Sequence, residues 1–457
     1  MHSAHRCPTD RPARFGAVLL LSLFLSPAAQ ADDWPQWLGP QRDDIWRETG
    51  IIEKFPPAGP TVRWRAPLGG GYTGPAVAEG RVYVMDRQLP ADAKPAPAAQ
   101  TGFMKRTQKP GSERVLCLNE ADGKLLWKHE YDCPYTVQYD SGPRTTPLVH
   151  DHKVYTVGAE GNLFCLDTDQ GKVIWSHDFK KDYGAKTQIW GFAGHPLLDG
   201  QRVICMVGGK DSTVVAFDKD TGKEIWKALS AQSLGYCPPM IYEAGGKRQL
   251  IIWHGEAICG LDPETGNVYW TQPYKAYMGM AIASPRKWSD DLFVTSTFGN
   301  SMMLNLASEK PGATIAWKGD GKISFDSVFA TPFFENGCVY GTSSNGELCC
   351  IEAATGKRQW ATFEPNSTKK VVRSADIFIT KNGDRFFLFT EKGDLIIARL
   401  TPKSYEETSR AHLLEPITEA FGRKVVWSHP AYANRSAFMR NDKEIICVLL
   451  ADSAGGK

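Results

Sequence analysis

The sequence predicts an all-β fold: an eight-bladed β-propeller of four-stranded antiparallel blades, closed into a ring by an N-terminal strand. Three observations predict it. The chain contains an internal repeat, most copies of the repeat end in a tryptophan, and one additional tryptophan stands ahead of the first copy. Repeats of a few tens of residues are typical of architectures in which each copy is one small sheet packed against its neighbours.

Seven of the eight copies of the repeat begin with a proline, which an apolar pair follows at a nearly constant spacing. Pro147 precedes Val154-Tyr155, for example, and the four runs PLVH, KVYTVG, NLFCLD and KVIWSH then read as the strands of a meander. The other anchor prolines are Pro75, Pro196, Pro239, Pro285, Pro332 and Pro430. An eighth copy near Asp376 lacks the proline. A lone four-stranded meander leaves two edges unpaired and one face uncovered, which a ring of such sheets avoids.

A turn of the form D/N-x-x-x-G-K, followed by tryptophan, ends most copies. The tryptophans interpreted as structural are Trp64, Trp127, Trp175, Trp226, Trp270, Trp317, Trp360 and Trp427. A large ring at the same place in each copy indicates packing between blades. Trp64, in TVRWRA, precedes the first copy, whereas the last copy has no tryptophan after it. The sequence therefore predicts that TVRWRA supplies the outer strand of the last blade.

The cysteines fit the repeat better than they fit a metal or redox site. Cys117, Cys165 and Cys350 stand where the third copy has Ala216, a position that requires a small buried side chain. Cys349 and Cys350 are adjacent in one strand and are expected to point to opposite faces. The chain has no C-x-x-C and no Cys/His spacing typical of zinc, so no metal site is predicted.

The N-terminus has the pattern of a secretory signal peptide. Basic residues precede the apolar run FGAVLLLSLFL, and Ala29-Gln30-Ala31 follows as a cleavage signal. The run is short for a membrane span. We expect cleavage after Ala31 and a periplasmic or secreted protein. Residues 32–60 would then form an N-terminal extension packed on the propeller, 61–450 the propeller and 451–457 a C-terminal tail.

Composition excludes some classes of partner. The net charge of +2 gives no electrostatic indication of nucleic-acid binding, and no second apolar run predicts a transmembrane segment. We expect a monomer. Two insertions interrupt the repeat: residues 88–112, rich in alanine and proline, are expected to form a mobile loop, and residues 403–423 could include a short helix.

The repeated L-x-C/A-L-D-x-x-T-G-K-x-x-W motif resembles the propeller repeat of the pyrroloquinoline-quinone (PQQ) type. The opening DWPQWLGPQRDD resembles the N-terminal signature of secreted bacterial members. The superfamily includes quinoprotein alcohol dehydrogenases, which hold the quinone and a calcium ion on the propeller axis. It also includes the propeller subunit of the outer-membrane barrel assembly machinery, which binds protein without a cofactor. The resemblance implies the fold and leaves the function open.

Functional groups of a propeller usually lie on loops at one mouth of the axial channel, here the loops that precede each innermost strand. The candidate ligand-binding residues of these loops are Tyr72, Arg144, Trp190, His195, Tyr236, Met280 and Arg373. Two further candidates, Asn434 and Arg435, follow the final proline instead. Arg144, Arg373 and Arg435 come from three blades. We expect the repeat register to bring all three near one end of the axis, where they would repel one another unless a small anionic ligand, an acidic partner segment or nearby carboxylates lay between them. The sequence therefore predicts a weak anion site at this mouth.

Three functions are compatible with this set. The first is a non-catalytic scaffold that binds a protein or a small ligand and needs no cofactor. The second is a PQQ- and calcium-dependent alcohol or sugar oxidoreductase, with the quinone stacked on Trp190 or Tyr236, Asp326 or Asp376 as the catalytic base, and Asn434 as a further oxygen. The third is a carbohydrate-binding module. The only vicinal cysteines lie inside a repeat strand, which departs from the pattern of the dehydrogenases.

Overall fold

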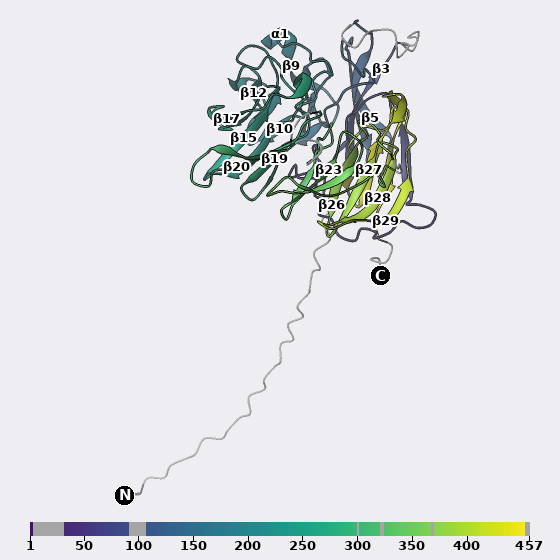
Figure 1. The fold of residues 1–457 in the computed structure, drawn as a ribbon. Helices are drawn as coiled ribbons and strands as arrows, with labels where there is room; N and C mark the ends of the chain where they lie inside the picture. Colours follow the sequence, from purple (N-terminus) through teal and green to yellow (C-terminus); the bar gives the residue numbers. More distant parts are fainter. Residues whose placement is uncertain (3–31, 91–106, 299–300, 320–323, 367–369, 453–457) are drawn as a thin grey trace. The chain divides into compact units, whose positions relative to one another are not determined.

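A computed structural model of the chain describes residues 1–2, 32–90, 107–298, 301–319, 324–366 and 370–452. Nearly all of the predicted signal peptide, and the central part of the insertion at residues 88–112, lie outside the described residues. The chain divides into two compact units, Met1–Gln30 and Ala31–Lys457, and the second unit contains the propeller (Figure 1).

The first four blades follow one another along the chain, each as a four-stranded antiparallel meander. Blade 1 is β2 (Ala76–Ala78), β3 (Arg81–Gln88), β4 (Ser112–Asn119) and β5 (Leu125–Asp132); blade 2 is β6 (Leu148–His150), β7 (Lys153–Val157), β8 (Asn162–Asp167) and β9 (Val173–Asp178). Blade 3 is β10 (Leu197–Asp199), β11 (Arg202–Met206), β12 (Val214–Asp218) and β13 (Glu224–Ala228); blade 4 is β14 (Met240–Ala244), β15 (Lys247–Trp253), β16 (Ala257–Leu261) and β17 (Val268–Pro273).

The second half of the chain continues the same pattern. Blade 5 is β18 (Arg286–Trp288), β19 (Asp291–Val294), β20 (Ser301–Leu306) and β21 (Ala313–Gly319); blade 6 is β22 (Phe333–Glu335), β23 (Cys338–Thr342), β24 (Leu348–Glu352) and β25 (Arg358–Thr362). Blade 7 is β26 (Ile377–Asn382), β27 (Arg385–Thr390), β28 (Asp394–Leu400) and β29 (Tyr405–His412); blade 8 begins with β32 (Ala431–Ala433), β33 (Ser436–Arg440) and β34 (Glu444–Leu449). The predicted eight-bladed propeller is confirmed.

The ring closes through the N-terminal strand, as predicted. β1 (Val62–Pro67) pairs antiparallel with β34 and completes blade 8, in the order β1-β34-β33-β32. Trp64 lies directly opposite Cys447, and a bulge interrupts the register next to Trp64. The same pairing recurs elsewhere: Trp127 lies opposite Cys117 and Trp175 opposite Cys165. A small residue opposite most of the large rings explains why the repeat has cysteine or alanine there; Trp317, opposite Met303, differs.

Six of the eight repeat tryptophans join one blade to the next. The indole N–H of Trp127 donates to the carbonyl oxygen of Thr168, 2.7 Å away in the turn of blade 2. Equivalent bonds run from Trp64 to Glu120, Trp175 to Lys219, Trp226 to Pro263, Trp317 to Ala353 and Trp360 to Thr401. Two tryptophans differ: the indole of Trp270 donates to the side chain of Gln249 in its own blade, and that of Trp427 donates to the carboxylate of Glu391. These contacts explain why the tryptophan and the turn recur together.

The turn requires glycine for two reasons: its backbone has a positive φ, and a side chain would collide with the tryptophan ring. Gly171 has φ +70°, and a Cβ built there would lie 2.4 Å from a ring carbon of Trp127. Gly80 has φ +72° but nothing within 4 Å of its would-be Cβ. We therefore expect Gly80→Ala to lower the free energy of unfolding by about 1 kcal/mol, from backbone strain alone. Gly171→Ala should lower the free energy of unfolding by about 2 kcal/mol more than Gly80→Ala does, because the ring of Trp127 must also move.

Urea denaturation of the two glycine variants measures this difference. Equal losses in both would show that the turn does not need glycine for its contact with the tryptophan.

The cysteines are buried and unpaired. The structure describes ten free cysteines, all buried. Cys349 and Cys350 point to different core clusters, as the alternation of a strand requires: Cys349 packs with Phe293 and Met303, whereas Cys350 packs with Phe333 and Leu388.

Two expectations about the region after residue 400 are wrong. Residues 403–423 contain no helix; they form the outer strand β29 and most of a hairpin of β30 (Thr418–Ala420) and β31 (Arg423–Val425). Trp427 follows that hairpin outside any strand, so it is not the outer-strand tryptophan of blade 7, whose β29 has none. The described helices are α1 (Phe179–Tyr183) and the 3₁₀ turn η1 (Tyr277–Gly279), and neither has the length or apolarity of a membrane span.

The N-terminal segment, residues 33–52, runs across the edges of the innermost strands. Trp34 exchanges backbone hydrogen bonds with Val77 of β2, and the amide of Val149 in β6 donates to Pro35. Further along, Trp46 and Lys381 of β26 are joined by a bond of 2.7 Å. The innermost strand of a blade has one edge without a partner strand. The N-terminal segment satisfies part of these edges in several blades.

Buried polar side chains hold the N-terminal segment in place. The guanidinium of Arg42 is buried and donates to the carbonyl oxygens of Pro196 and Pro239 at 2.9 and 3.2 Å. Arg286 of blade 5 donates to the carbonyl of Asp43, and Asn382 of blade 7 donates to those of Trp46 and Glu48. The segment is thus bonded to blades on different sides of the ring, so it crosses the axial region.

Candidate functional site

A cavity of about 400 Å³ lies on the propeller axis. All eight connections that lead into an innermost strand contribute lining residues, together with Trp37 of the N-terminal segment. Six of the candidate residues line it, namely Tyr72, Arg144, Trp190, His195, Tyr236 and Met280. The loops selected from the sequence therefore do meet at one place, and the N-terminal segment contributes to the wall of the cavity.

The lining is dominated by aromatic rings. They belong to Trp37, Tyr72, Tyr139, Trp190, Tyr236, Tyr277, Phe298, Phe329, Phe378, Phe421 and Trp427. The rings of Trp190 and Tyr236 meet edge to face at 5.6 Å, and those of Phe329 and Trp427 at 4.9 Å. Sequence reasoning named few of these rings. Most of the others stand in the same loops, and their number there is the signal that could have found them.

His195 connects the N-terminal segment to the cavity wall. Its ring stacks on Trp37 with 4.6 Å between the ring centres and 9° between the planes. Its Nδ1 accepts a hydrogen bond of 2.8 Å from the amide of Thr146, which leaves the proton of the neutral ring on Nε2. Burial, together with the nearby charge of Arg42, holds the pKa of His195 well below its ordinary value. His195 is therefore a neutral donor at neutral pH.

The surroundings of His429 favour the charged ring, in contrast to those of His195. Its Nδ1 lies 2.7 Å from the carbonyl oxygen of Pro430, and its Nε2 lies 3.1 Å from a carboxylate oxygen of Asp44 in the N-terminal segment. Burial disfavours the charged ring, but Asp44 outweighs it and raises the pKa of His429 above the ordinary value. The charged pair ties blade 8 to the N-terminal segment.

The two histidines predict opposite pH dependences of stability. In the unfolded chain His195 takes up a proton near pH 6.5, whereas in the folded chain its pKa is lower. The contribution of His195 to the free energy of unfolding is therefore complete above pH 6.5. It falls by up to about 1.4 kcal/mol per pH unit on acidification. The contribution of His429 is complete below pH 6.5 and is lost as the pH rises through its raised pKa. Unfolding free energies from pH 5 to 9 should show a flatter acid limb for His195→Asn and a flatter alkaline limb for His429→Asn.

An unchanged acid limb in His195→Asn would contradict the neutral, buried state of that ring.

The predicted convergence of three arginines is wrong. Arg144 lines the cavity, but its guanidinium donates to the carbonyl oxygens of Gly142, Gln138 and Tyr139 in its own connection. Arg373 is exposed and does not line the cavity. Arg435 lies with Asn434 in the turn between β32 and β33, at the end of β32 remote from His429. A sharp two-residue turn places both residues on the far side of the blade from the mouth.

Neither candidate carboxylate faces the cavity. Asp326 accepts hydrogen bonds from the hydroxyl and the amide of Ser344 at 2.7 and 3.3 Å. Asp376 is fully buried, and its Oδ2 accepts from the amides of Phe329 and Ala330, while its Oδ1 has no hydrogen-bond partner. Burial raises the pKa of Asp376 to about 8. Asp376 therefore supports the loop that carries Phe329 into the cavity wall.

The residues around the cavity do not fit PQQ and calcium. The described residues contain no cluster of three or more His, Cys, Asp or Glu side chains arranged to hold a metal ion. Three quinone carboxylates need free cationic donors, whereas Arg144 is bonded to three backbone carbonyls. The N-terminal segment also occupies part of the axial region.

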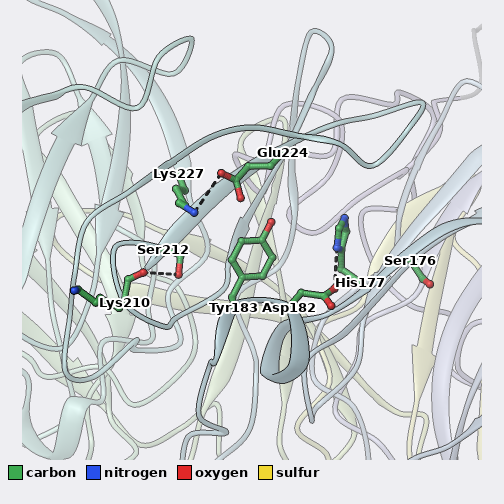
Figure 2. A pocket seen from close by; sticks show the side chains of 8 residues that line it. All are labelled: Ser176, His177, Asp182, Tyr183, Lys210, Ser212, Glu224 and Lys227. Atoms are coloured by element: carbon green, nitrogen blue, oxygen red, sulfur yellow. Dashed lines mark hydrogen bonds and ion pairs between the residues drawn. The ribbon is translucent and has the colours of Figure 1, made fainter.

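A second pocket, of about 490 Å³, is open and polar and lies between blades 2 and 3 (Figure 2). His177 pairs with Asp182 at 3.0 Å, and Lys227 pairs with Glu224 at 3.5 Å. Tyr183 lies between these two pairs in Figure 2. The described residues that line this pocket belong to blades 2 and 3 and their connection, whereas all eight blades contribute to the axial cavity, which is therefore the stronger candidate site.

The fold and the repeat define a β-propeller of the PQQ-type repeat class. The family profile described as outer membrane protein assembly factor BamB matches residues 111–318 and 308–404, which together span more than half of the chain. The chain belongs to this family. No curated protein sequence matches it.

Solved structures agree with this assignment at the level of the fold. BamB from Moraxella catarrhalis is 15% identical with a TM-score of 0.51, over 80% of this chain and 98% of that one. Quinohemoprotein alcohol dehydrogenase from Comamonas testosteroni is 12% identical with a TM-score of 0.58, over 92% and 80%. A europium-containing methanol dehydrogenase is also 12% identical with a TM-score of 0.58, over 91% and 89%. The fold is thus shared by an assembly factor and by dehydrogenases.

Proposed function

We propose that the protein is a non-catalytic, periplasmic or secreted binding module whose axial cavity takes up an apolar, aromatic part of a ligand or partner protein. The observation that carries this proposal is the aromatic cavity, to which every blade contributes a connection. Ligand sites are typically concave and mostly apolar, with a few oriented polar groups, and 400 Å³ is within their usual range. The description of the matching family, an outer membrane protein assembly factor, supports a role in holding another protein.

The oxidoreductase alternative has weaker support. Dehydrogenases share the fold, but at 12% identity this carries no information about activity. Asp326 and Asp376 are both engaged away from the cavity, so neither is placed to act as a base there. A carbohydrate-binding role is the second candidate, because the aromatic faces of the cavity could stack on sugar rings.

Thermal unfolding with small probes tests the proposal. We expect indole to raise the unfolding midpoint of the protein, since a ligand that binds only the folded state stabilises it. Ala193 lines the cavity, so Ala193→Trp should fill it and abolish the shift. The same exchange at Ala361, exposed on the outer strand β25, is the matched control and should leave the shift intact.

Two results would overturn this assignment. Dye-linked oxidation of ethanol after reconstitution with PQQ and calcium would establish the oxidoreductase. A shift with cellobiose but not with indole, lost in Ala193→Trp, would establish the carbohydrate-binding module.

A further inference from the structure

Four exposed apolar side chains surround the axial cavity. Tyr277, Met278, Phe298 and Phe421, which we call the rim, are 53%, 38%, 54% and 55% exposed, and all four also line the cavity. Tyr277 and Phe298 meet edge to face at 5.9 Å, and Phe421 packs against Trp427 at 6.0 Å. Exposed apolar groups that cluster around a cavity, rather than being scattered singly, mark an interaction site.

The backbone of the rim is strained. Met278, Phe298 and Phe421 have φ of 51°, 49° and 49°, in the left-handed region that bulky side chains rarely adopt. Tyr139 and Ser374, which also line the cavity, have φ of 52° and 54°. Strained residues persist where the surrounding structure imposes them, and they cluster at ligand sites. Five of the eighteen described non-glycine residues with positive φ line this cavity.

The charge of the lining limits what can bind. None of the described lining residues carries a carboxylate, whereas Arg144 and His429 are cationic or can become so. A basic group entering the cavity would find no counter-charge and would lose its hydration. The occupant is therefore neutral or acidic where it enters.

The N-terminal segment shows which kind of occupant the axial region accepts. Trp34 and Pro35 of this segment bond through their backbone to β2 and β6. The chain then turns at residues 37–42, and the ring of Trp37 packs against His195. Trp37 forms part of the wall of the cavity itself. A second extended segment entering past the rim would continue this interface, with an aromatic side chain meeting the remaining rings.

We propose that the rim and the cavity bind an extended, neutral or acidic segment of a partner protein, with an aromatic side chain as its anchor. This inference rests on the proposed binding function and specifies its ligand class. An aromatic ring enters the cavity, where Trp190, Tyr236 and Trp427 surround it, and the flanking backbone lies over the rim.

Fluorescence anisotropy with defined peptides tests the inference. The probe is a labelled, acetylated and amidated twelve-residue peptide of glycine, serine and aspartate with tryptophan–glycine–phenylalanine at its centre. Matched peptides replace both aromatic residues with alanine, or the aspartates with lysine. We expect saturable binding of the aromatic, acidic peptide and affinity at least about tenfold weaker for each matched peptide.

Rim variants locate the binding. Phe421→Asn and Met278→Asn remove the apolar groups while keeping a residue that tolerates the left-handed backbone, so folding should be preserved. Each should weaken peptide binding about tenfold. Leu125→Asn and Ile225→Asn, at exposed apolar positions of outer strands, are the controls and should leave affinity unchanged.

Equal binding by the rim variants and the parent protein, or tighter binding of the lysine peptide, would overturn the inference. If indole stabilises the protein through the cavity while no peptide binds, the binding-module proposal stands and the peptide inference fails. If neither binds, both fail.

Discussion

A chain that begins at Leu68 is expected to unfold with a free energy at least about 4 kcal/mol lower than one that begins at Thr61. The shorter chain lacks β1, and β34 then loses its backbone partner from Val62 to Pro67. It also loses the buried ring of Trp64, and removal of a buried aromatic residue alone costs about 3–5 kcal/mol. Both chains lack the N-terminal segment, so their difference isolates ring closure.

Urea unfolding and light scattering measure this effect, with the chain that begins at Asp32 as the reference. The chain that begins at Leu68 should also aggregate, because the apolar strand β34 presents an open edge. Identical unfolding curves for the chains beginning at Thr61 and Leu68 would show that blade 8 does not need β1.

Replacement of Asp376 by asparagine is expected to stabilise the protein by about 4 kcal/mol at pH 7. Burial raises the pKa of this carboxyl from 3.8 to about 8. Between these two pH values the folded chain therefore keeps a proton that the unfolded chain has released. Wild-type stability should then fall by up to about 1.4 kcal/mol per pH unit between pH 4 and 8. Asparagine keeps an oxygen that can accept from the amides of Phe329 and Ala330, and it does not ionise.

The decisive measurement is the difference in unfolding free energy between Asp376→Asn and the parent protein at pH 4.5, 6 and 7.5. The difference should grow with pH. The matched control, Asp384→Asn, alters an exposed carboxylate and should change stability by less than about 0.5 kcal/mol. A difference that does not vary with pH would mean that Asp376 is ionised in the folded protein.

Most of the fold could be predicted from the repeat because the same physical contact recurs in most of its copies. The indole of Trp127, the glycine at 171 and the small residue Cys117 form one unit, and each part constrains the others. That local consistency makes the number of blades and the closing strand readable from the sequence. From the sequence, Trp427 is assigned to the repeat despite the longer stretch before it, whereas the actual outer strand, β29, has no tryptophan and has polar or charged residues at most positions.

The site was less predictable because loop conformation decides it. The right loops could be chosen from their place before each innermost strand, and Trp190, His195 and Tyr236 do meet there. Whether an arginine faces the cavity depends on a few backbone angles. Arg435 has φ +51° in a tight turn, and Arg144 is held by carbonyls of its own connection. Nothing in the sequence pattern indicated that residues 33–52 cross the axis, since that path uses scattered side chains such as Arg42.

Ring closure by β1 has a consequence for the order of folding. Trp64 is among the first residues of the propeller to be synthesised, yet its partner Cys447 is among the last. The seven blades between them can each form from local hairpins, but the eighth must wait for the whole chain, and contacts of such separation slow folding. A circular permutant in which β1 directly follows β34 would turn this closing contact into a hairpin and should refold faster.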